Sequence, residues 1–184
     1  MQIGVIILAK RGTTKFRSNL QEKQVAEELN GRVQIASGAL DDKADVRTDK
    51  FLVECKTTEK FYYALSVSIW NKVYKEANKL GLCPVMCVHT NDTDSLYSAD
   101  RYCILRKEDF DYFLFSSETS GDLIPNSECS TIKLETKKFN KQIFTCNSDE
   151  DTYIELSSDR FAKGVTSLVV FPWSHFLNMI SSLK

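Results

Sequence analysis

The segment Ala44–Thr57, reading ADVRTDKFLVECKT, constrains the fold more than any other part of the 184-residue chain. If Asp49 and Lys50 form a two-residue turn, the flanking residues pair as an antiparallel β-hairpin with a fixed register. Asp45 then stands opposite Glu54, and directly opposed residues have Cβ atoms roughly 4.5–5.5 Å apart on one face of the sheet. The pattern therefore predicts a hairpin that forces two carboxylates together.

The same face collects a lysine. Lys56 lies two residues beyond Glu54 and points to the same side of the strand, whereas Val53 and Cys55 point to the other side, into apolar packing. Two opposed carboxylates are destabilising unless a cation bridges them. A hard divalent cation such as Mg²⁺ prefers a few carboxylate oxygens, a carbonyl and retained waters. The hairpin therefore predicts a magnesium site beside a lysine.

A helix is expected over residues 19–30, opened by a capping box in which Ser18 and Gln21 satisfy backbone donors. At about 100° per residue, Glu22 lies on the same stripe of this helix as Leu29, facing the core side. In a surface helix without a functional role, glutamates are expected on the solvent-facing side and not on the stripe that faces the core. The alternative is that Glu22 belongs to the capping turn, where the helix dipole favours an acid.

The remaining periodicity indicates a mixed α/β fold (α+β): a mixed central β-sheet flanked by helices. Strands are expected at residues 32–35, 44–47, 51–56, 83–88, 101–106, 131–135, 142–145, 152–156 and 167–171. Further helices are expected at residues 67–80, 107–115 and 172–183, and residues 116–130 are expected to be loop. We expect a core at residues 1–92 and an α/β C-terminal extension at residues 93–184, which could pack on the core as one domain.

Charge is distributed unevenly along the chain. Residues 1–92 hold 14 Lys and Arg against 11 Asp and Glu, whereas residues 93–184 hold 10 against 14. The densest positive segment comprises Lys10, Arg11, Lys15, Arg17 and Lys23, with Glu22 as its single acid. A basic stretch on a near-neutral protein suits contact with a polyanion, and the alternative is a solvated charged segment.

Cysteine and histidine usage excludes an obvious zinc site. The six cysteines form no C-x-x-C pair, and His89 and His175 are the two histidines. Buried free thiols in a reducing compartment are the expectation, which favours the cytoplasm. The apolar run Ile3–Ala9 is too short to span a bilayer, which takes about 20 residues, so we expect a buried strand and no membrane association.

Asp45, followed by Glu54-Cys55-Lys56 at the end of an apolar strand, resembles the PD-(D/E)XK nuclease superfamily, with Ala44 where the motif often has proline. The archaeal-type and phage-encoded Holliday-junction resolvases are the most similar members. The resemblance spans about residues 10–90: a helix beginning near Glu22, the small-residue loop Ala36–Gly38, the hairpin, a second helix and an apolar strand. It implies a restriction-endonuclease-like core, and an active site built from these acids and the lysine.

The resemblance also implies roles. Asp45, Glu54, the Cys55 backbone carbonyl and Glu22 would hold one or two Mg²⁺ ions (Mn²⁺ can substitute), and Lys56 would orient or deprotonate the attacking water or stabilise the transition state. Contacts to DNA phosphates are expected from Lys10, Arg11, Lys15, Arg17, Ser37, Lys43 and Arg47. Branched DNA is the expected substrate and a two-fold homodimer the expected assembly. A phage-encoded protein would act in the host cytoplasm.

Three functions stay open on the sequence. The first is a junction resolvase. The second is a restriction, repair or recombination endonuclease of the same fold that acts on another DNA substrate, with the acidic second half as a specificity or partner module. The third is a DNA- or protein-binding module on a nuclease scaffold without activity, against which the complete set of acids and lysine argues.

Overall fold

The computed structural model describes residues 14–34, 44–91, 100–117, 123–125, 131–135, 140–144 and 152–182. The helices are α1 (Thr14–Glu28), α2 (Val67–Leu80), α3 (Lys107–Ser116) and α4 (Trp173–Ser181). The strands are β1 (Arg32–Val33), β2 (Val46–Arg47), β3 (Phe51–Thr57), β4 (Tyr63–Ser66), β5 (Cys83–Thr90), β6 (Asp100–Arg106), β7 (Ile124–Pro125), β8 (Thr131–Glu135), β9 (Asn140–Phe144), β10 (Thr152–Ser157) and β11 (Ser167–Pro172).

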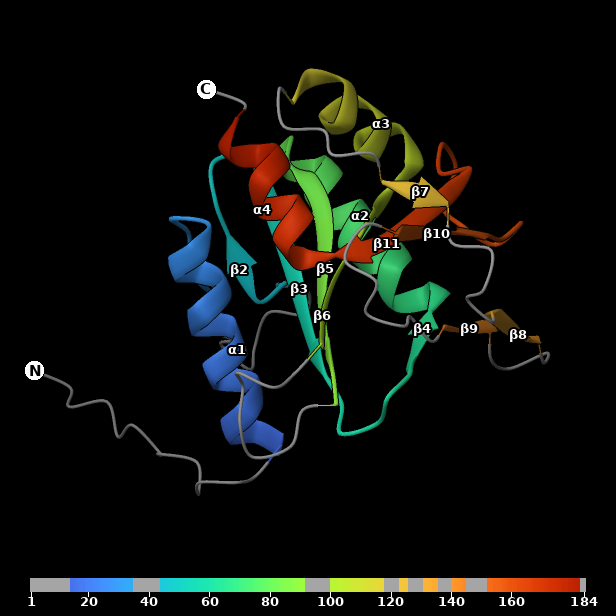
Figure 1. Ribbon diagram of the computed structural model, residues 1–184, viewed down its shortest axis with the longest axis horizontal. Helices are drawn as coiled ribbons and strands as arrows, with labels where there is room; N and C mark the ends of the chain where they lie inside the picture. Colours follow the sequence, from blue (N-terminus) through green and yellow to red (C-terminus); the bar gives the residue numbers. More distant parts are fainter. Residues whose placement is uncertain are drawn as a thin grey trace, which may run out of the picture.

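A mixed sheet forms the centre of the molecule (Figure 1). Its eight strands run in the order β1-β2-β3-β5-β6-β11-β10-β7, and β4, β9 and β8 form a second, three-stranded sheet. The pairs β3–β5 and β10–β7 are parallel, and the other neighbours in the large sheet are antiparallel. The chain passes from β3 to its parallel neighbour β5 through β4 and α2, because parallel neighbours need a crossover connection. The mixed α/β architecture expected from the sequence is therefore confirmed.

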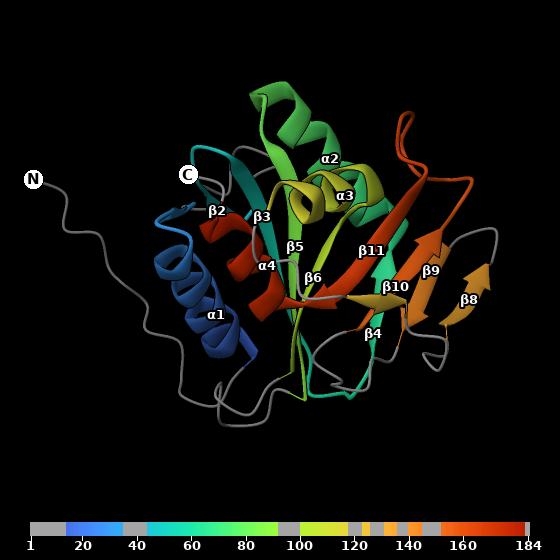
Figure 2. The same cartoon turned by 45° about the horizontal axis from the view of Figure 1, so that its top comes forward.

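Helices cover both faces of the large sheet, as two views show (Figures 1 and 2). Alternate residues of β5 separate the two cores: Val85 and Cys87 pack with α1, α3 and α4, whereas Met86 and Val88 pack with α2. This follows from the two-residue repeat of a strand, which sends neighbouring side chains to opposite faces. Because both faces of β5 are covered, the strand is apolar along most of its length.

Several boundaries differ from those expected. Helix α1 begins at Thr14, so Ser18 lies inside the helix and the capping box was wrong. Strands β4 and β7 were not predicted, and β7 lies within the stretch expected to be loop. Helix α2 has the predicted bounds, and Gly81, with a φ of 67°, ends it in the left-handed conformation, its N–H donating to the Asn78 carbonyl. The expected strand at Ile3–Ala9 lies outside the described residues.

Both halves of the chain contribute to the large sheet. Strand β5 lies before residue 92 and β6 after it, and the two pair antiparallel, with Cys87 opposite Cys103. Strands β11 and β10 then extend the sheet beyond β6. The β-structure of residues 93–184 is thus continuous with that of the first half.

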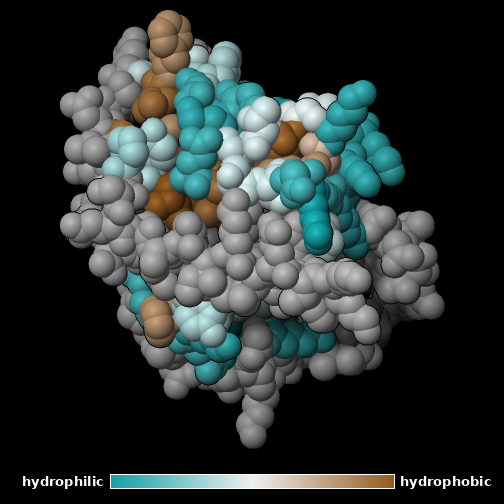
Figure 3. Space-filling view, turned by 90° about the vertical axis from the view of Figure 1, so that its right-hand side faces the viewer, coloured by the Kyte–Doolittle hydropathy of each residue, from teal (hydrophilic) through white to brown (hydrophobic). Residues whose placement is uncertain are grey.

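Four cysteines fall in the described part of the chain, and all four are free thiols: Cys55, Cys83, Cys87 and Cys103. Burial raises the pKa of the Cys87 thiol to about 12, so it is protonated and unreactive at neutral pH. On the face to the right of Figure 1, the coloured residues are mainly hydrophilic with small apolar patches between them (Figure 3). No helix among the described residues is both long and apolar enough to cross a membrane.

Candidate functional site

The β2–β3 hairpin has the register that the turn length predicted. Val46 pairs with Val53 and Arg47 with Leu52, and the Thr48 N–H donates to the Phe51 carbonyl at 2.9 Å. The Thr48 hydroxyl closes the turn by accepting a hydrogen bond of 2.8 Å from the Phe51 N–H. Asp45 directly precedes this paired segment, and its side chain reaches across to the Cys55 N–H of β3.

Asp45 is fixed across the hairpin. Its Oδ2 accepts a hydrogen bond of 2.7 Å from the Cys55 N–H, and its own carbonyl accepts from the Gln34 N–H at 2.8 Å. Burial, followed by the charge of Glu54, raises the pKa of Asp45 to about 6, although the Cys55 N–H and the Lys56 ammonium act in the opposite direction. The Asp45 carboxylate is therefore partly desolvated and lies near a second acid.

Lys56 contacts the second acid of the hairpin. Its Nζ donates to Glu54 Oε1 at 2.5 Å and to the Cys55 carbonyl at 3.2 Å. Burial by itself would lower the pKa of this lysine, but the charge and hydrogen bond of Glu54, together with the charge of Asp45, raise it above its ordinary value. Lys56 is therefore an ammonium at neutral pH, and it is held beside Glu54 on the same strand.

Glu22 reaches the same group of charges from α1. The helix begins eight residues earlier, and no acid lies in its first turn, so the capping explanation for Glu22 was wrong. Burial raises the pKa of Glu22, a hydrogen bond of 3.1 Å from the Ser18 hydroxyl and the charge of Lys56 lower it, and the charge of Glu54 raises it. Glu22 thus lies close enough to both Glu54 and Lys56 to interact with them electrostatically.

Gln21 is a buried residue of this region that the sequence analysis did not select for the site. Its side chain has no exposed surface, and its Nε2 donates to the carbonyl of Lys56 at 3.1 Å and to that of Cys87 at 3.0 Å. These carbonyls belong to the neighbouring parallel strands β3 and β5, so Gln21 ties α1 to both. Its spacing of four and eight residues from Val25 and Leu29 is the signal that could have found it.

A second polar cluster holds the other end of α1. Glu28 accepts two hydrogen bonds from Arg101, at 2.8 and 2.6 Å, and one from the Trp173 indole N–H at 2.8 Å. Arg101 Nε also donates to Nε2 of His89, a residue with no exposed surface, at 3.0 Å. The cluster therefore joins α1 to β5, β6 and α4.

The residues expected to contact DNA phosphates differ in how far they are exposed to solvent. Lys15 is exposed on α1, and Arg47 is partly buried on β2. Arg17 is 8% exposed and its guanidinium pairs with Glu59, so in this arrangement it holds the turn after β3 rather than facing solvent. The other expected contacts lie outside the described residues: Lys10, Arg11, Ser37 and Lys43.

The donor set of the hairpin suits magnesium. Among the described residues, no three side chains of His, Cys, Asp or Glu are grouped closely enough to hold a metal ion by themselves. Mg²⁺ does not need three, because it keeps several waters and binds through one or two carboxylates together with substrate phosphates. Asp45, Glu54 and the Cys55 carbonyl are oxygen donors of this kind. Burial, and then the charge of Glu54, raises the pKa of Asp45, and a bound cation would offset both effects.

Comparison with known proteins places the chain in no family. No protein-family model matches it, and the curated proteins contain no match. Among solved structures, the chain is similar to Hjc, a Holliday junction resolvase from the archaeal hyperthermophile Archaeoglobus fulgidus, with 11% sequence identity and a TM-score of 0.41. The alignment covers 67% of this chain and 85% of that one. A likeness of this extent does not assign the chain to a family.

Proposed function

We propose that this protein is a Mg²⁺-dependent endonuclease that hydrolyses phosphodiester bonds in DNA. The observation that supports it is the convergence of Asp45, Glu54 and Lys56 on one hairpin, with Glu22 facing them from α1. Three carboxylates and one ammonium gathered at a partly buried place cost stability unless they bind something, and paired acids with a lysine suit phosphoryl chemistry. The sequence resemblance to the PD-(D/E)XK nucleases supports the same conclusion independently of the packing.

In this proposal Asp45, Glu54 and the Cys55 carbonyl would hold Mg²⁺ or Mn²⁺, and Glu22 would help to hold a second ion. A bound Mg²⁺ lowers the pKa of a coordinated water and neutralises charge on the phosphate. The hydrogen bond from the Cys55 N–H fixes one oxygen of Asp45 and so orients the other. In this proposal the hairpin would present these oxygen donors to the ion, with Asp45 held by its bond to β3.

Lys56 has a narrower role than the sequence left open. As an ammonium paired with Glu54, it has no lone pair with which to take a proton from water. It can donate hydrogen bonds to the attacking water or to the phosphate oxygens on which charge develops. We therefore propose that Lys56 orients the water or stabilises the transition state rather than acting as the general base.

The substrate that we propose is branched DNA, as for a Holliday-junction resolvase, and this choice rests on the sequence resemblance. Symmetric cleavage of a four-way junction requires two sites related by a two-fold axis, so the proposal includes a homodimer acting in the cytoplasm of the cell or of a phage host. Within the described chain, Lys15 and Arg47 are the cations proposed to contact backbone phosphates.

The decisive experiment is metal-dependent cleavage by purified protein of a synthetic four-way junction, a flap, a nicked duplex and a linear duplex. Glu54→Ala should lose cleavage of every substrate because it removes a proposed metal ligand, and Lys56→Ala because it removes the cation proposed to act on the water or the phosphate. DNA binding and the circular-dichroism spectrum should stay unchanged in both. Lys79→Ala, an exposed lysine at the end of α2, is the matched control and should cleave normally. Full activity of either site variant would contradict the assignment.

The pattern of substrates separates the finer alternatives. Cleavage confined to the junction would support a resolvase, and comparable cleavage of linear duplex would support another endonuclease of this type. No cleavage by the wild-type protein with either Mg²⁺ or Mn²⁺ would leave a non-catalytic binding module. Light scattering at micromolar concentration tests the dimer, and a monomer would contradict it.

A further inference from the structure

The chain makes a short turn immediately after Lys56 that presents an aromatic ring to solvent. We call residues 58–62, TEKFY, the aromatic turn; it links β3 to β4. Phe61 is 66% exposed within it, one of few large apolar side chains in the described chain that face solvent. Single exposed apolar side chains are common, so the groups around this ring decide what it can bind.

The aromatic turn is held in place at several points. The Thr58 N–H donates to the His89 carbonyl at 2.9 Å, and the Asn91 N–H donates to the Lys60 carbonyl at 2.9 Å. Glu59 pairs with the buried Arg17 of α1. The turn is therefore fixed to the end of β5 and to α1, and a partner that binds it meets a preorganised surface.

The groups around Phe61 suit a nucleic acid. Its ring packs edge-to-face on Tyr62, with the centroids 5.3 Å apart and an interplanar angle of 82°. The Lys60 ammonium lies 5.1 Å from the centroid of the Tyr62 ring and donates to its hydroxyl at 3.0 Å. The exposed Phe61 ring and the Lys60 ammonium thus belong to the same short turn, and an aromatic face with a nearby cation suits a base and its backbone phosphate.

We propose that Phe61 stacks on a nucleobase that has left the duplex stack close to the cleaved bond; this rests on the proposed nuclease function. Phe61 follows Lys56 by five residues, so their Cα atoms are at most about 17 Å apart. One strand of DNA rises 3.4 Å per nucleotide, so this largest Cα separation corresponds to about five nucleotides along a strand. Bases inside an intact duplex offer no free face, whereas those at a branch point do. The aromatic turn would thus select distorted DNA.

Equilibrium binding to labelled DNA tests this proposal without cleavage. The probes are a four-way junction and a linear duplex with the same arm sequence, measured by fluorescence anisotropy in EDTA at one fixed salt concentration. Phe61→Ala should weaken binding to the junction by about 5- to 150-fold, the range for losing one stacked base. Binding to the linear duplex should change less than about twofold. Phe61→Trp should restore junction binding, because indole offers a larger face.

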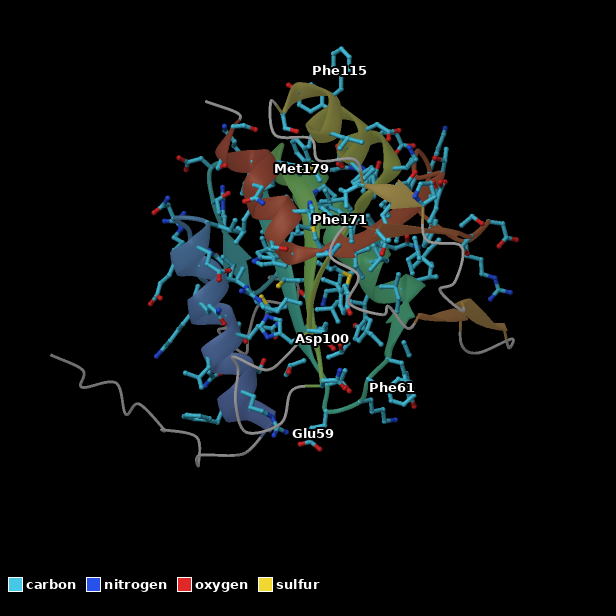
Figure 4. The ribbon with its side chains drawn as sticks, in the orientation of Figure 1. Glu59, Phe61, Asp100, Phe115, Phe171 and Met179 are labelled. Carbon is cyan, nitrogen blue, oxygen red and sulfur yellow. The ribbon has the colours of Figure 1, made fainter. Side chains whose placement is uncertain are left out.

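Phe115→Ala is the control. Phe115 is 93% exposed on α3, and Figure 4 places it at the opposite end of the molecule from Phe61 and Glu59. Equal binding of the junction by wild type and Phe61→Ala would overturn the proposal, as would equal weakening by Phe115→Ala. The proposal would also be overturned if Phe61→Ala changed the oligomeric state but not DNA binding, because the ring would then belong to a contact between protein chains. If wild type prefers the junction to the duplex through Phe61 but cleaves no DNA, the stacking site stands and the proposed nuclease function is refuted.

Discussion

Acid should destabilise this protein through His89. The imidazole has no exposed surface, and its Nε2 accepts a hydrogen bond of 3.0 Å from Arg101, which fixes the neutral form. Burial, and then the charge of Arg101, lowers the pKa of His89 from 6.5 to about 3, and the nearby Glu28 only partly offsets this. In the unfolded chain the same imidazole takes up a proton at its ordinary pKa.

The magnitude follows from proton linkage. Between pH 6.5 and about 3 the unfolded chain binds one more proton at this position than the folded chain, so the free energy of unfolding falls as the pH falls through this window. Going from pH 7 to pH 5, the binding of this proton favours the unfolded state by about 2 kcal/mol. The pKa of Glu28, which is held low despite burial by its hydrogen bonds to Arg101 and Trp173, adds to the loss at still lower pH.

Urea unfolding at pH 7 and pH 5, followed by circular dichroism, measures the loss. His89→Gln removes the titration and keeps a side-chain oxygen that can accept from Arg101, so the difference between the two pH values should shrink by about 2 kcal/mol. If wild type and His89→Gln lose the same stability on acidification, the buried neutral imidazole does not govern the acid response.

Two further predictions concern the site and its support. Gln21→Met keeps the volume of the side chain but removes its hydrogen bonds to the buried carbonyls of Lys56 and Cys87, so we expect a destabilisation of about 0.5–1.5 kcal/mol for each; an unchanged urea midpoint would show that α1 is held without these bonds. Mg²⁺ should raise the melting temperature of wild type. The free energy of unfolding should rise by about 2.7 kcal/mol when the free ion is at 100 times its dissociation constant. Asp45→Asn should melt higher than wild type in EDTA, because it removes carboxylate repulsion, and should gain nothing from Mg²⁺; a Mg²⁺ shift equal to that of wild type would contradict the metal role of Asp45.

The sequence predicted the hairpin because a two-residue turn leaves a single register. Once Val46 is opposite Val53, the faces of Asp45, Glu54 and Lys56 follow from the two-residue repeat of a strand. The start of α1 was missed because Ser18 satisfied a capping rule that depends on three or four residues alone. In the structure the Ser18 hydroxyl donates to Glu22 instead, one turn further along the same helix.

Other features could not be predicted because their partners are distant in the chain. Strand β4 is short, and its hydrogen-bonding partner β9 lies far beyond it in sequence, with Tyr63 opposite Phe144. Glu28 meets Arg101 across 73 residues and Trp173 across 145. The residue pattern within one segment gives no information on contacts with residues so far away in the sequence. The same limit applies to Arg17: its charge suggested a phosphate contact, and only the fold reveals its pairing with Glu59.

The second half of the chain supports the proposed site without supplying its acids. Glu22 lies on α1 between two buried attachments: Gln21, bonded to β3 and β5, and Glu28, bonded to Arg101 and Trp173. The segment between the attachments is about 10 Å long at 1.5 Å per residue, so a helix held at both cannot rotate about its axis. The rotation of α1 decides whether Glu22 faces the hairpin or solvent. Since Arg101 and Trp173 lie beyond residue 92, the chain needs its second half to keep the helix acid beside Glu54 and Lys56.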